Sequence, residues 1–143
     1  MPRQPQEPVL FTLDEADRLI PKIRQMLYSL RAHRDRIVKW EEKKAVEELS
    51  WLQEDGTVSP KAQREVARLE ALQQKEAVLF EKGLKEFHAT GAELKDLNEG
   101  LVDFYTRRGD EVVYLCWKDG EDQILYWHDF SSGAAGRRPI AEL

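Results

Sequence analysis

Residues 54–60 read EDGTVSP and separate two long stretches of helical periodicity. Asp55 and Gly56 are typical of a turn. Ser59 followed by Pro60 is typical of a helix start, because serine caps free amide groups and proline is tolerated in the first helical turn. We therefore expect a helix on each side of this segment. Two long helices joined by a short polar turn predict an antiparallel hairpin that resembles a coiled coil.

The helix before the turn is predicted from Leu13 to about Leu52. Thr12 and Glu15 have the spacing of a capping box, in which each side chain binds the amide group of the other residue. Beyond Leu30 the apolar pattern thins, but helix formers and oppositely charged pairs at helical spacing continue. The apolar residues up to that point repeat at spacings of three and four, which places them in one stripe: Leu13, Ala16, Ile20, Ile23, Leu27 and Leu30.

The helix after the turn is predicted from Pro60 to Gly91, since glycine often ends a helix. If the turn is centred on Gly56, Gly91 lies opposite Pro21 of the first helix. Residues 13–20 then extend past the hairpin and need another apolar surface to cover them. The expected apolar face of the second helix, with Gln73 in the remaining position, consists of Ala62, Val66, Leu69, Ala77, Phe80, Leu84 and Phe87.

From residue 92 onward the period changes from helical to alternating. Segments rich in β-branched and aromatic residues predict antiparallel strands at 101–105, 112–117 and 123–128, with 93–97 as a candidate fourth strand. Residues 131–139 are expected to form a loop. The sequence thus predicts an α+β fold: a tail at 1–11, a helical hairpin at 12–91, and a small sheet of three or four strands at 92–143. We expect this sheet and its C-terminal loop to pack on the start of the first helix as a single structural unit.

The chain has 143 residues and a formal net charge of −5. It lacks the basic field from which nucleic-acid and anionic-membrane binders gain affinity, so we expect neither partner. The first residues have no apolar core of a signal peptide, and no apolar run approaches the ~18 residues of a membrane span. These features predict a cytoplasmic protein. The only cysteine, Cys116, excludes a disulfide or a multi-thiolate zinc site within one chain.

Candidate chemistry lies in the predicted strands, at Asp103, Cys116 and His128. In one interpretation Cys116 is a nucleophile or a metal ligand beside His128, and Asp103 orients the imidazole. In the other, Cys116 is a buried thiol, His128 ends a strand and Asp103 lies in a turn. The strand register decides whether Cys116 and His128 share a face, and the sequence leaves it open. A metal would need two further ligands, from Asp103, Asp129 or another subunit.

Arginine pairs supply a second set of candidates. Arg137 and Arg138 follow a glycine-rich loop and could hold a phosphate or a carboxylate, or they could be solvated or paired within the chain. Arg107 and Arg108 fall in a predicted turn and give a weaker indication of the same kind. These four arginines and the nearby tryptophans also permit a nucleic-acid interpretation, which the acidic net charge and the lack of a known binding module disfavour.

Apolar residues outside the main stripes suggest self-association. Leu72 and Leu79 are seven residues apart and form a second apolar strip on the second helix, and Trp40 lies off the stripe of the first. They either widen the hairpin face or form an oligomer interface. We favour an interface, most simply a homodimer, because a two-helix arm buries little surface by itself.

Several motifs extend over nearly the whole chain: Phe11-Thr12-Leu13-Asp14-Glu15-Ala16, Leu19-Ile20-Pro21, Gly100-Leu101-Val102-Asp103-Phe104, Tyr114-Leu115-Cys116-Trp117, Tyr126-Trp127-His128 and Gly136-Arg137-Arg138-Pro139. With these motifs the chain resembles a bacterial family known as domain of unknown function 2203 (DUF2203). The resemblance implies no established activity. It implies that six residues belong to the family's recurring pattern, which favours a shared site, either chemical or architectural: Asp103, Cys116, Trp117, His128, Arg137 and Arg138.

Two functional hypotheses follow, and no catalytic signature decides between them. The first is a non-enzymatic, self-associating interaction or regulatory module. The second is a site for a metal or a small anion, catalytic or not, formed by Asp103, Cys116, His128 and the pair Arg137 and Arg138. The sequence requires no cofactor, and a metal at Cys116 and His128 belongs to the second hypothesis.

Overall fold

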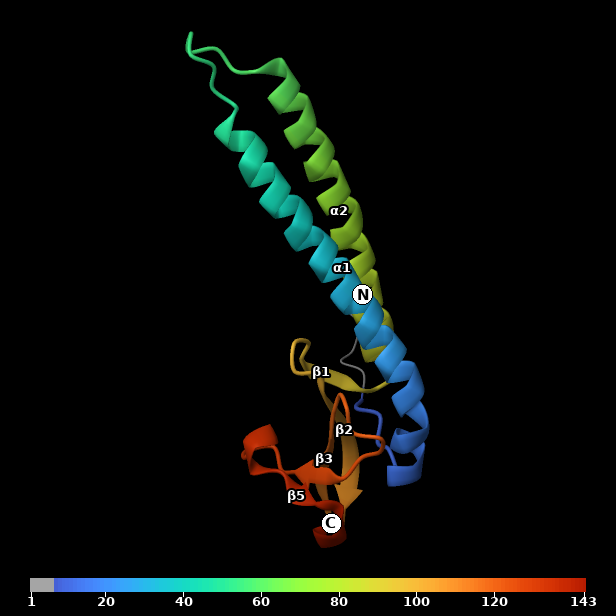
Figure 1. Ribbon diagram of the computed structural model, residues 1–143. Helices are drawn as coiled ribbons and strands as arrows, with labels where there is room; N and C mark the ends of the chain where they lie inside the picture. Colours follow the sequence, from blue (N-terminus) through green and yellow to red (C-terminus); the bar gives the residue numbers. More distant parts are fainter. Residues whose placement is uncertain (1–6) are drawn as a thin grey trace. The chain divides into compact units, whose positions relative to one another are not determined.

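The computed structural model describes residues 7–143 and confirms the α+β class (Figure 1). Residues 1–6 of the predicted tail lie outside the described residues. The strands form one antiparallel sheet in the order β1-β2-β3-β4-β5, so the sheet has five strands and not three or four. The elements are α1 (Leu13–Leu49), α2 (Pro60–Ala89), β1 (Glu93–Asp96), β2 (Leu101–Arg108), β3 (Glu111–Lys118), β4 (Tyr126–His128), η1 (Ala134–Gly136), β5 (Arg138–Pro139) and η2 (Ile140–Glu142).

The chain divides into two compact units, and Ser29–Leu84 forms the hairpin unit. There α1 and α2 lie side by side and run antiparallel (Figure 1). α1 ends at Leu49, before the predicted end, because the connecting segment pairs with itself. The amide of Gln53 donates to the carbonyl of Thr57 at 2.8 Å, and the amide of Ser59 donates to the carbonyl of Trp51 at 2.7 Å. Across residues 7–143, no helix is long and apolar enough to cross a membrane.

A buried carboxylate interrupts the apolar contact between the two helices. Glu76 is buried and Ala77 is exposed, so the expected place of Ala77 on the apolar face is wrong. Glu76 accepts from Arg36 Nε at 2.8 Å, and its other carboxylate oxygen lies 2.5 Å from His33 Nδ1. Because two basic side chains of α1 surround this carboxylate, a charged residue is stable at a position where an apolar one was expected.

The other unit combines the start of α1, up to Tyr28, with everything from Lys85 onward. Two side chains of α1 bind the loop before β4: Asp17 Oδ1 accepts from the amide of Ile124 at 2.8 Å, and Arg24 Nη2 donates to the carbonyl of Glu121 at 2.7 Å. The core of this unit consists of buried residues from α1 and from one face of the sheet, namely Ala16, Ile20, Ile23, Leu27, Val102, Phe104, Val113, Leu115, Trp117 and Trp127.

The largest differences between the predicted and the observed strands concern β2, β4 and β5. β2 continues to Arg108, so only Gly109 and Asp110 remain in the turn to β3. β4 begins only at Tyr126, because the residues before it are bound outside the sheet. Ile124 donates its amide to Asp17 of α1, and Leu125 accepts from the amide of Ile140 in the C-terminal segment at 2.9 Å. The predicted loop contains β5, and its Pro139 is tolerated because β5 is an edge strand.

Candidate metal centre

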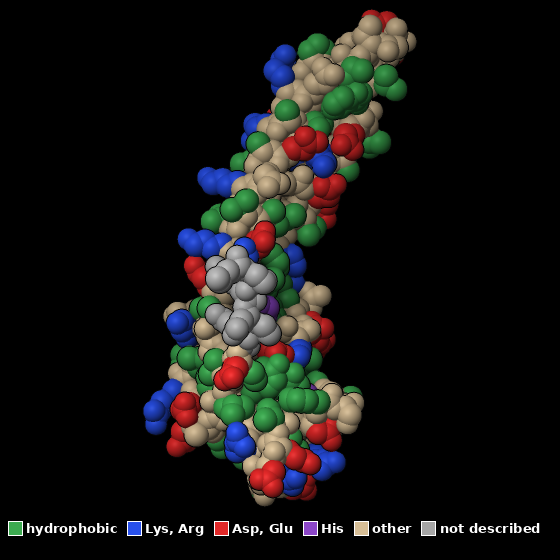
Figure 2. Space-filling model, turned by 180° about the vertical axis from the view of Figure 1, so that it is seen from behind, with side chains coloured by type: hydrophobic (Ala, Val, Ile, Leu, Met, Phe, Trp, Pro, Cys, Tyr) green, Lys and Arg blue, Asp and Glu red, His purple; other side chains and the backbone are tan. Residues whose placement is uncertain are grey.

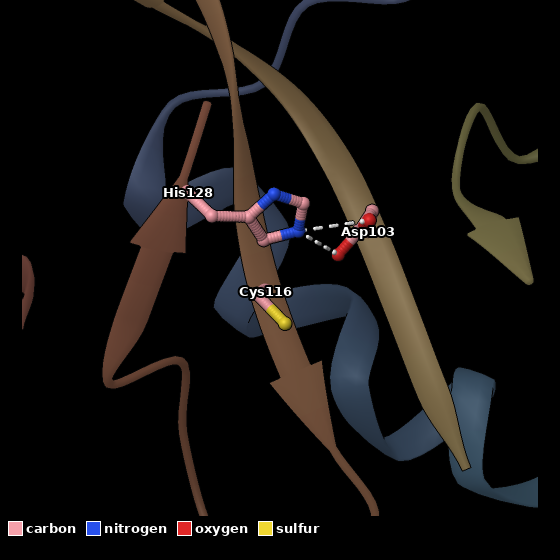
Figure 3. A group of neighbouring side chains, drawn as sticks. All are labelled: Asp103, Cys116 and His128. Carbon is pink, nitrogen blue, oxygen red and sulfur yellow. Dashed lines mark hydrogen bonds and ion pairs between the residues drawn. The ribbon is translucent and has the colours of Figure 1, made fainter. Parts of the chain in front are cut away.

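The strand register brings the three candidate side chains onto one face of the sheet. Asp103 of β2 pairs with Cys116 of β3, and Cys116 pairs with Tyr126 of β4. His128 lies two residues beyond Tyr126, and side chains two apart on a strand point to the same face. Asp103, Cys116 and His128 therefore lie on the face opposite the apolar core (Figure 3).

The side chains of this triad are packed closely together. One oxygen of Asp103, the sulfur of Cys116 and one ring nitrogen of His128 all lie within 4.8 Å of one another. His128 Nε2 is 3.1 Å from both carboxylate oxygens of Asp103 (Figure 3). The side chains of His128 and Asp103 are only 3% and 4% exposed, and Cys116 is fully buried. In the described part of the chain, this is the only such group of potential ligands.

The protonation of His128 follows from its two partners. Nδ1 lies 2.7 Å from the backbone carbonyl of Asp129, which can only accept, so Nδ1 carries a proton. The contact between Nε2 and the Asp103 carboxylate then requires a second proton, on one partner or the other. Burial raises the pKa of Asp103, and the charge of His128 opposes that rise. The pair thus shares one proton at a place where a metal ion could bind instead.

Cys116 is a protonated thiol in this environment. Burial raises its pKa to about 12, and the negative charge of Asp103 adds to the shift. A nucleophilic cysteine needs a lowered pKa, so the arrangement disfavours thiolate catalysis at neutral pH. A bound divalent cation would instead lower the pKa of Cys116, because a thiol that coordinates a metal loses its proton.

The remaining predicted site residues are divided between the two faces of the sheet. Arg137 lies beside the triad: its positive charge opposes the rise in the pKa of Cys116, its Cζ lies 4.3 Å from the ring centre of Tyr126, and its Nη1 donates to Glu121 Oε1 at 3.2 Å. Trp117 lies in the apolar core, on the other face of the sheet from the triad. Arg138 lies on the same core-facing side, against Trp127. The triad and Arg137 therefore form one cluster that excludes Trp117 and Arg138.

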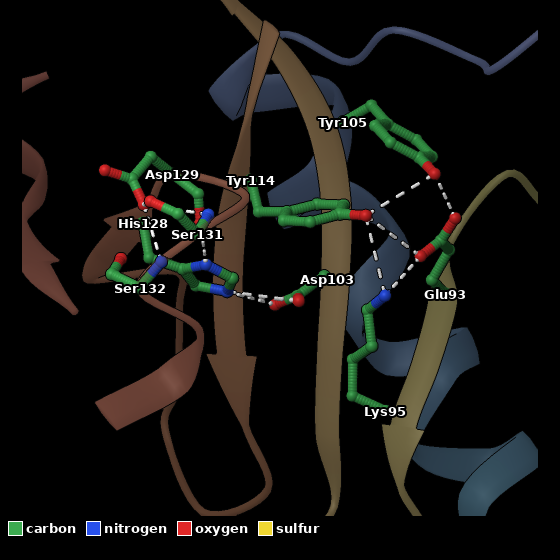
Figure 4. A network of polar contacts seen from close by, with 9 residues as sticks. All are labelled: Glu93, Lys95, Asp103, Tyr105, Tyr114, His128, Asp129, Ser131 and Ser132. Atoms are coloured by element: carbon green, nitrogen blue, oxygen red, sulfur yellow. Dashed lines mark hydrogen bonds and ion pairs between the residues drawn. The ribbon is translucent and has the colours of Figure 1, made fainter. Parts of the chain in front are cut away.

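A short loop after β4 holds His128 in place. The carboxylate of Asp129 accepts from the amide groups of Ser131 and Ser132, at 3.1 Å and 2.7 Å, and from the Ser131 hydroxyl at 3.0 Å (Figure 4). Hydrogen bonds from Ser132 first and then from Ser131 lower the pKa of Asp129 to about 2. The same residue presents the carbonyl that binds His128 Nδ1. Asp129 is therefore not a fourth ligand in this arrangement, but it orients the imidazole.

A second polar network on the same face was missed by sequence reasoning. Tyr105 donates to Glu93, and Tyr114 lies 3.3 Å from the other carboxylate oxygen of Glu93 (Figure 4). Lys95 forms an ion pair with Glu93 at 2.6 Å, and the hydrogen bond to Glu93 raises the pKa of Tyr105. The alternation of polar residues along 93–95 and 103–105 is the available signal, because it marks the face of the sheet that carries Asp103.

The donor set of the triad fits a divalent metal of intermediate softness. Thiolate sulfur, imidazole nitrogen and carboxylate oxygen are the ligands of Zn²⁺ in proteins. A zinc-bound histidine usually donates its other ring N–H to a carbonyl or a carboxylate, and His128 Nδ1 does so to Asp129. Nε2 is therefore the nitrogen that would bind the ion.

Comparison with curated proteins and with solved structures finds no match. A family model described as an uncharacterized conserved protein, DUF2203, matches residues 9–140, which include both helices and the triad. The resemblance carried by the sequence motifs is thus confirmed over nearly the whole chain, and this protein belongs to the DUF2203 family.

Proposed function

We propose that this protein binds a single divalent metal ion, best matched by Zn²⁺, through Asp103, Cys116 and His128. The observation that carries the proposal is the convergence of one oxygen, one sulfur and one nitrogen donor within 4.8 Å at a buried place. Three protein ligands leave a fourth position for water or a small ligand, as in catalytic zinc sites. The positive charge of Arg137, which acts to lower the pKa of Cys116, would stabilise the thiolate of the loaded site.

The proposal is tested by titrating metal into protein freed of metal with a chelator. Co²⁺ is the spectroscopic probe, because a cobalt–thiolate bond gives a charge-transfer band and Cys116 is the only thiol in the chain. We expect the band to saturate at one Co²⁺ per chain and to disappear when Zn²⁺ is added. Absence of the band at millimolar Co²⁺, with folded protein, would overturn the proposal.

Matched variants separate the triad from general carboxylate and imidazole binding. Asp103→Asn and His128→Gln each remove one ligand, and we expect each to weaken Zn²⁺ binding at least tenfold. The controls are Asp110→Asn and His88→Gln, because both side chains belong to exposed residues of the same unit. Equal affinities in all four variants would show that the triad does not hold the ion.

Self-association through the hairpin is a second candidate function. Leu79 is 37% exposed, and Trp40 and Leu72 are only half-buried. On the face that Figure 2 shows, charged side chains of both signs alternate with hydrophobic ones along the hairpin. We propose that a second copy covers these apolar residues, giving a homodimer that acts in the cytoplasm as an interaction module.

The native mass in solution tests this second candidate. We expect a dimer at micromolar concentration, and we expect Leu72→Asp with Leu79→Asp to shift it to monomer. Ala71→Asp is the matched control, since it adds a charge at an exposed position of the same helix. A wild-type chain that is monomeric at micromolar concentration would overturn the homodimer and leave the metal proposal untouched.

A further inference from the structure

The opposite face of the same sheet carries a separate cluster of positive charge. We propose that Arg108, Arg138 and Trp127 form a binding site for a dianionic phosphate group, either free phosphate or a phosphate monoester. This site is independent of the metal centre, because its three residues lie on the core-facing side, where Trp127 is buried and no member of the triad points.

Strand pairing places both arginines against one indole ring. Arg138 of β5 pairs directly with Trp127 of β4, and its Cζ lies 5.3 Å from the centre of the ring. Arg108 ends β2 on the same face, and its Cζ lies 4.6 Å from that centre. The ring contacts thus hold the two guanidinium groups beside one buried side chain before any anion binds. Less side-chain entropy is then lost when an anion binds.

Neither guanidinium forms an ion pair with the described residues. In the described part of the chain, Arg108 donates to the carbonyl of Glu142 at 3.3 Å, and neither it nor Arg138 has a carboxylate partner. Arg137, next in sequence, is instead paired with Glu121 at 3.2 Å. In a chain of net charge −5, two arginines without an ion pair gather on one ring, and the acidic residue that lies opposite Arg108 in the strand register is Glu111. Such a pair attracts an anion.

The buried indole supplies an independent indication of a missing acceptor. Over residues 7–143, Trp127 Nε1 is the one buried side-chain nitrogen or oxygen without a hydrogen-bond partner. Indole N–H groups usually find a partner when buried. By contrast, Trp117 Nε1 donates to the carbonyl of Glu121 at 2.9 Å. An oxyanion held by Arg108 and Arg138 would provide the acceptor if one of its oxygens reaches the ring edge that carries Nε1.

The chemistry favours phosphate over carboxylate. Two positive charges match a phosphate group, which carries close to two negative charges at neutral pH. Its oxygens can accept from both guanidinium forks and still leave one for the indole, whereas a carboxylate has only two oxygens to share. The planar guanidinium group also pairs with two phosphate oxygens at once.

Nuclear magnetic resonance of ¹⁵N-labelled protein tests the site, with the indole N–H signal of Trp127 as the reporter. Trp127→Phe assigns that signal, and the Trp117 signal reports whether the fold is kept. We expect inorganic phosphate or glycerol 2-phosphate to shift the Trp127 signal saturably, while sodium chloride at equal ionic strength does not. The tighter of the two probes distinguishes free phosphate from a phosphate monoester as the natural ligand type.

Substitutions decide whether the two arginines carry the binding. Arg108→Gln and Arg138→Gln should each weaken it about tenfold or more, the usual worth of a hydrogen bond to a charged group. Arg107→Gln is the matched control, because Arg107 is exposed and alternation places it on the other face of β2. The proposal is overturned if chloride produces the same shift, if phosphate produces none, or if Arg107→Gln weakens binding as much as Arg108→Gln.

Discussion

Asp103 and Cys116 occupy directly opposite positions on β2 and β3, and the Cys116 sulfur lies within 4.8 Å of a carboxylate oxygen of Asp103. Burial and this negative neighbour together raise the pKa of Cys116 to about 12. The pairing therefore keeps the sulfur protonated and unreactive as long as no cation binds between the two side chains.

Alkylation of Cys116 should be slow in the folded, metal-free protein. The pKa of an ordinary thiol is about 9.0, so a rise to about 12 lowers the thiolate fraction about 1000-fold near neutral pH. We expect iodoacetamide to modify the native chain at least a hundredfold more slowly than the chain in denaturant. Equal rates in the two conditions would contradict the buried, protonated thiol.

The same thiol should make stability fall at alkaline pH. A pKa that is higher in the folded state contributes stability below pH 9, and this contribution is lost as the pH rises from 9 toward 12. Within that window, wild type should lose up to about 1.4 kcal/mol per pH unit relative to Cys116→Ala. Urea unfolding of both proteins in chelator at pH 7, 9, 10 and 11 measures the difference. Parallel curves would show that Cys116 does not titrate in this way.

Removing the charge of Glu76 should destabilise the hairpin. Burial opposes ionisation of this carboxyl, but hydrogen bonds from His33 and Arg36 outweigh it and lower its pKa. Glu76→Gln removes the negative charge and keeps a single acceptor oxygen for two basic side chains, and we expect a loss of about 1–3 kcal/mol in the free energy of unfolding. Glu70→Gln, an exposed position of α2, should change it by no more than about 0.5 kcal/mol. Similar values for the two variants would mean that the buried cluster contributes nothing.

Gly91 is a position where a side chain cannot be accommodated. Its φ is +94°, and an added Cβ would lie 2.7 Å from the Cβ of Val9. Gly109 also has a positive φ, of +59°, but nothing lies within 4 Å of an added Cβ. Gly109→Ala should cost about 1–2 kcal/mol through the backbone alone, and Gly91→Ala should cost more. Thermal unfolding compares them, and an equal cost would show that Val9 moves away freely.

Local signals in the sequence predicted the helices well and the strand ends less well. α1 begins with the predicted capping box, in which Glu15 donates its amide to the Thr12 hydroxyl at 3.2 Å, and α2 begins at Pro60. Residues 123–125 alternate like a strand, yet tertiary bonds to α1 and to the C-terminal segment keep them out of β4. Strand propensity depends on the local sequence and therefore does not predict hydrogen bonds to residues far away in the chain.

The residues of the candidate site could be chosen from the sequence, but their arrangement could not. Asp103, Cys116 and His128 were candidates because of their chemistry, whereas their common face depends on the register between β3 and β4. A centre of the turn between Gly120 and Glu121 would place Cys116 beside Leu125, but it pairs with Tyr126. This shift of one residue arises because the connection is a long loop bound to α1, not a tight hairpin turn.

Spreading the triad over three successive strands also constrains when the site can form during folding. Its members are separated by 13 and 12 residues, far from the short spacings with which an unfolded chain can chelate an ion. A slip of β3 by one residue would turn Cys116 toward the core and destroy the donor set. Metal binding would therefore follow correct strand pairing. Because the ion would bind only chains with the correct register, it would stabilise them relative to chains with misaligned strands.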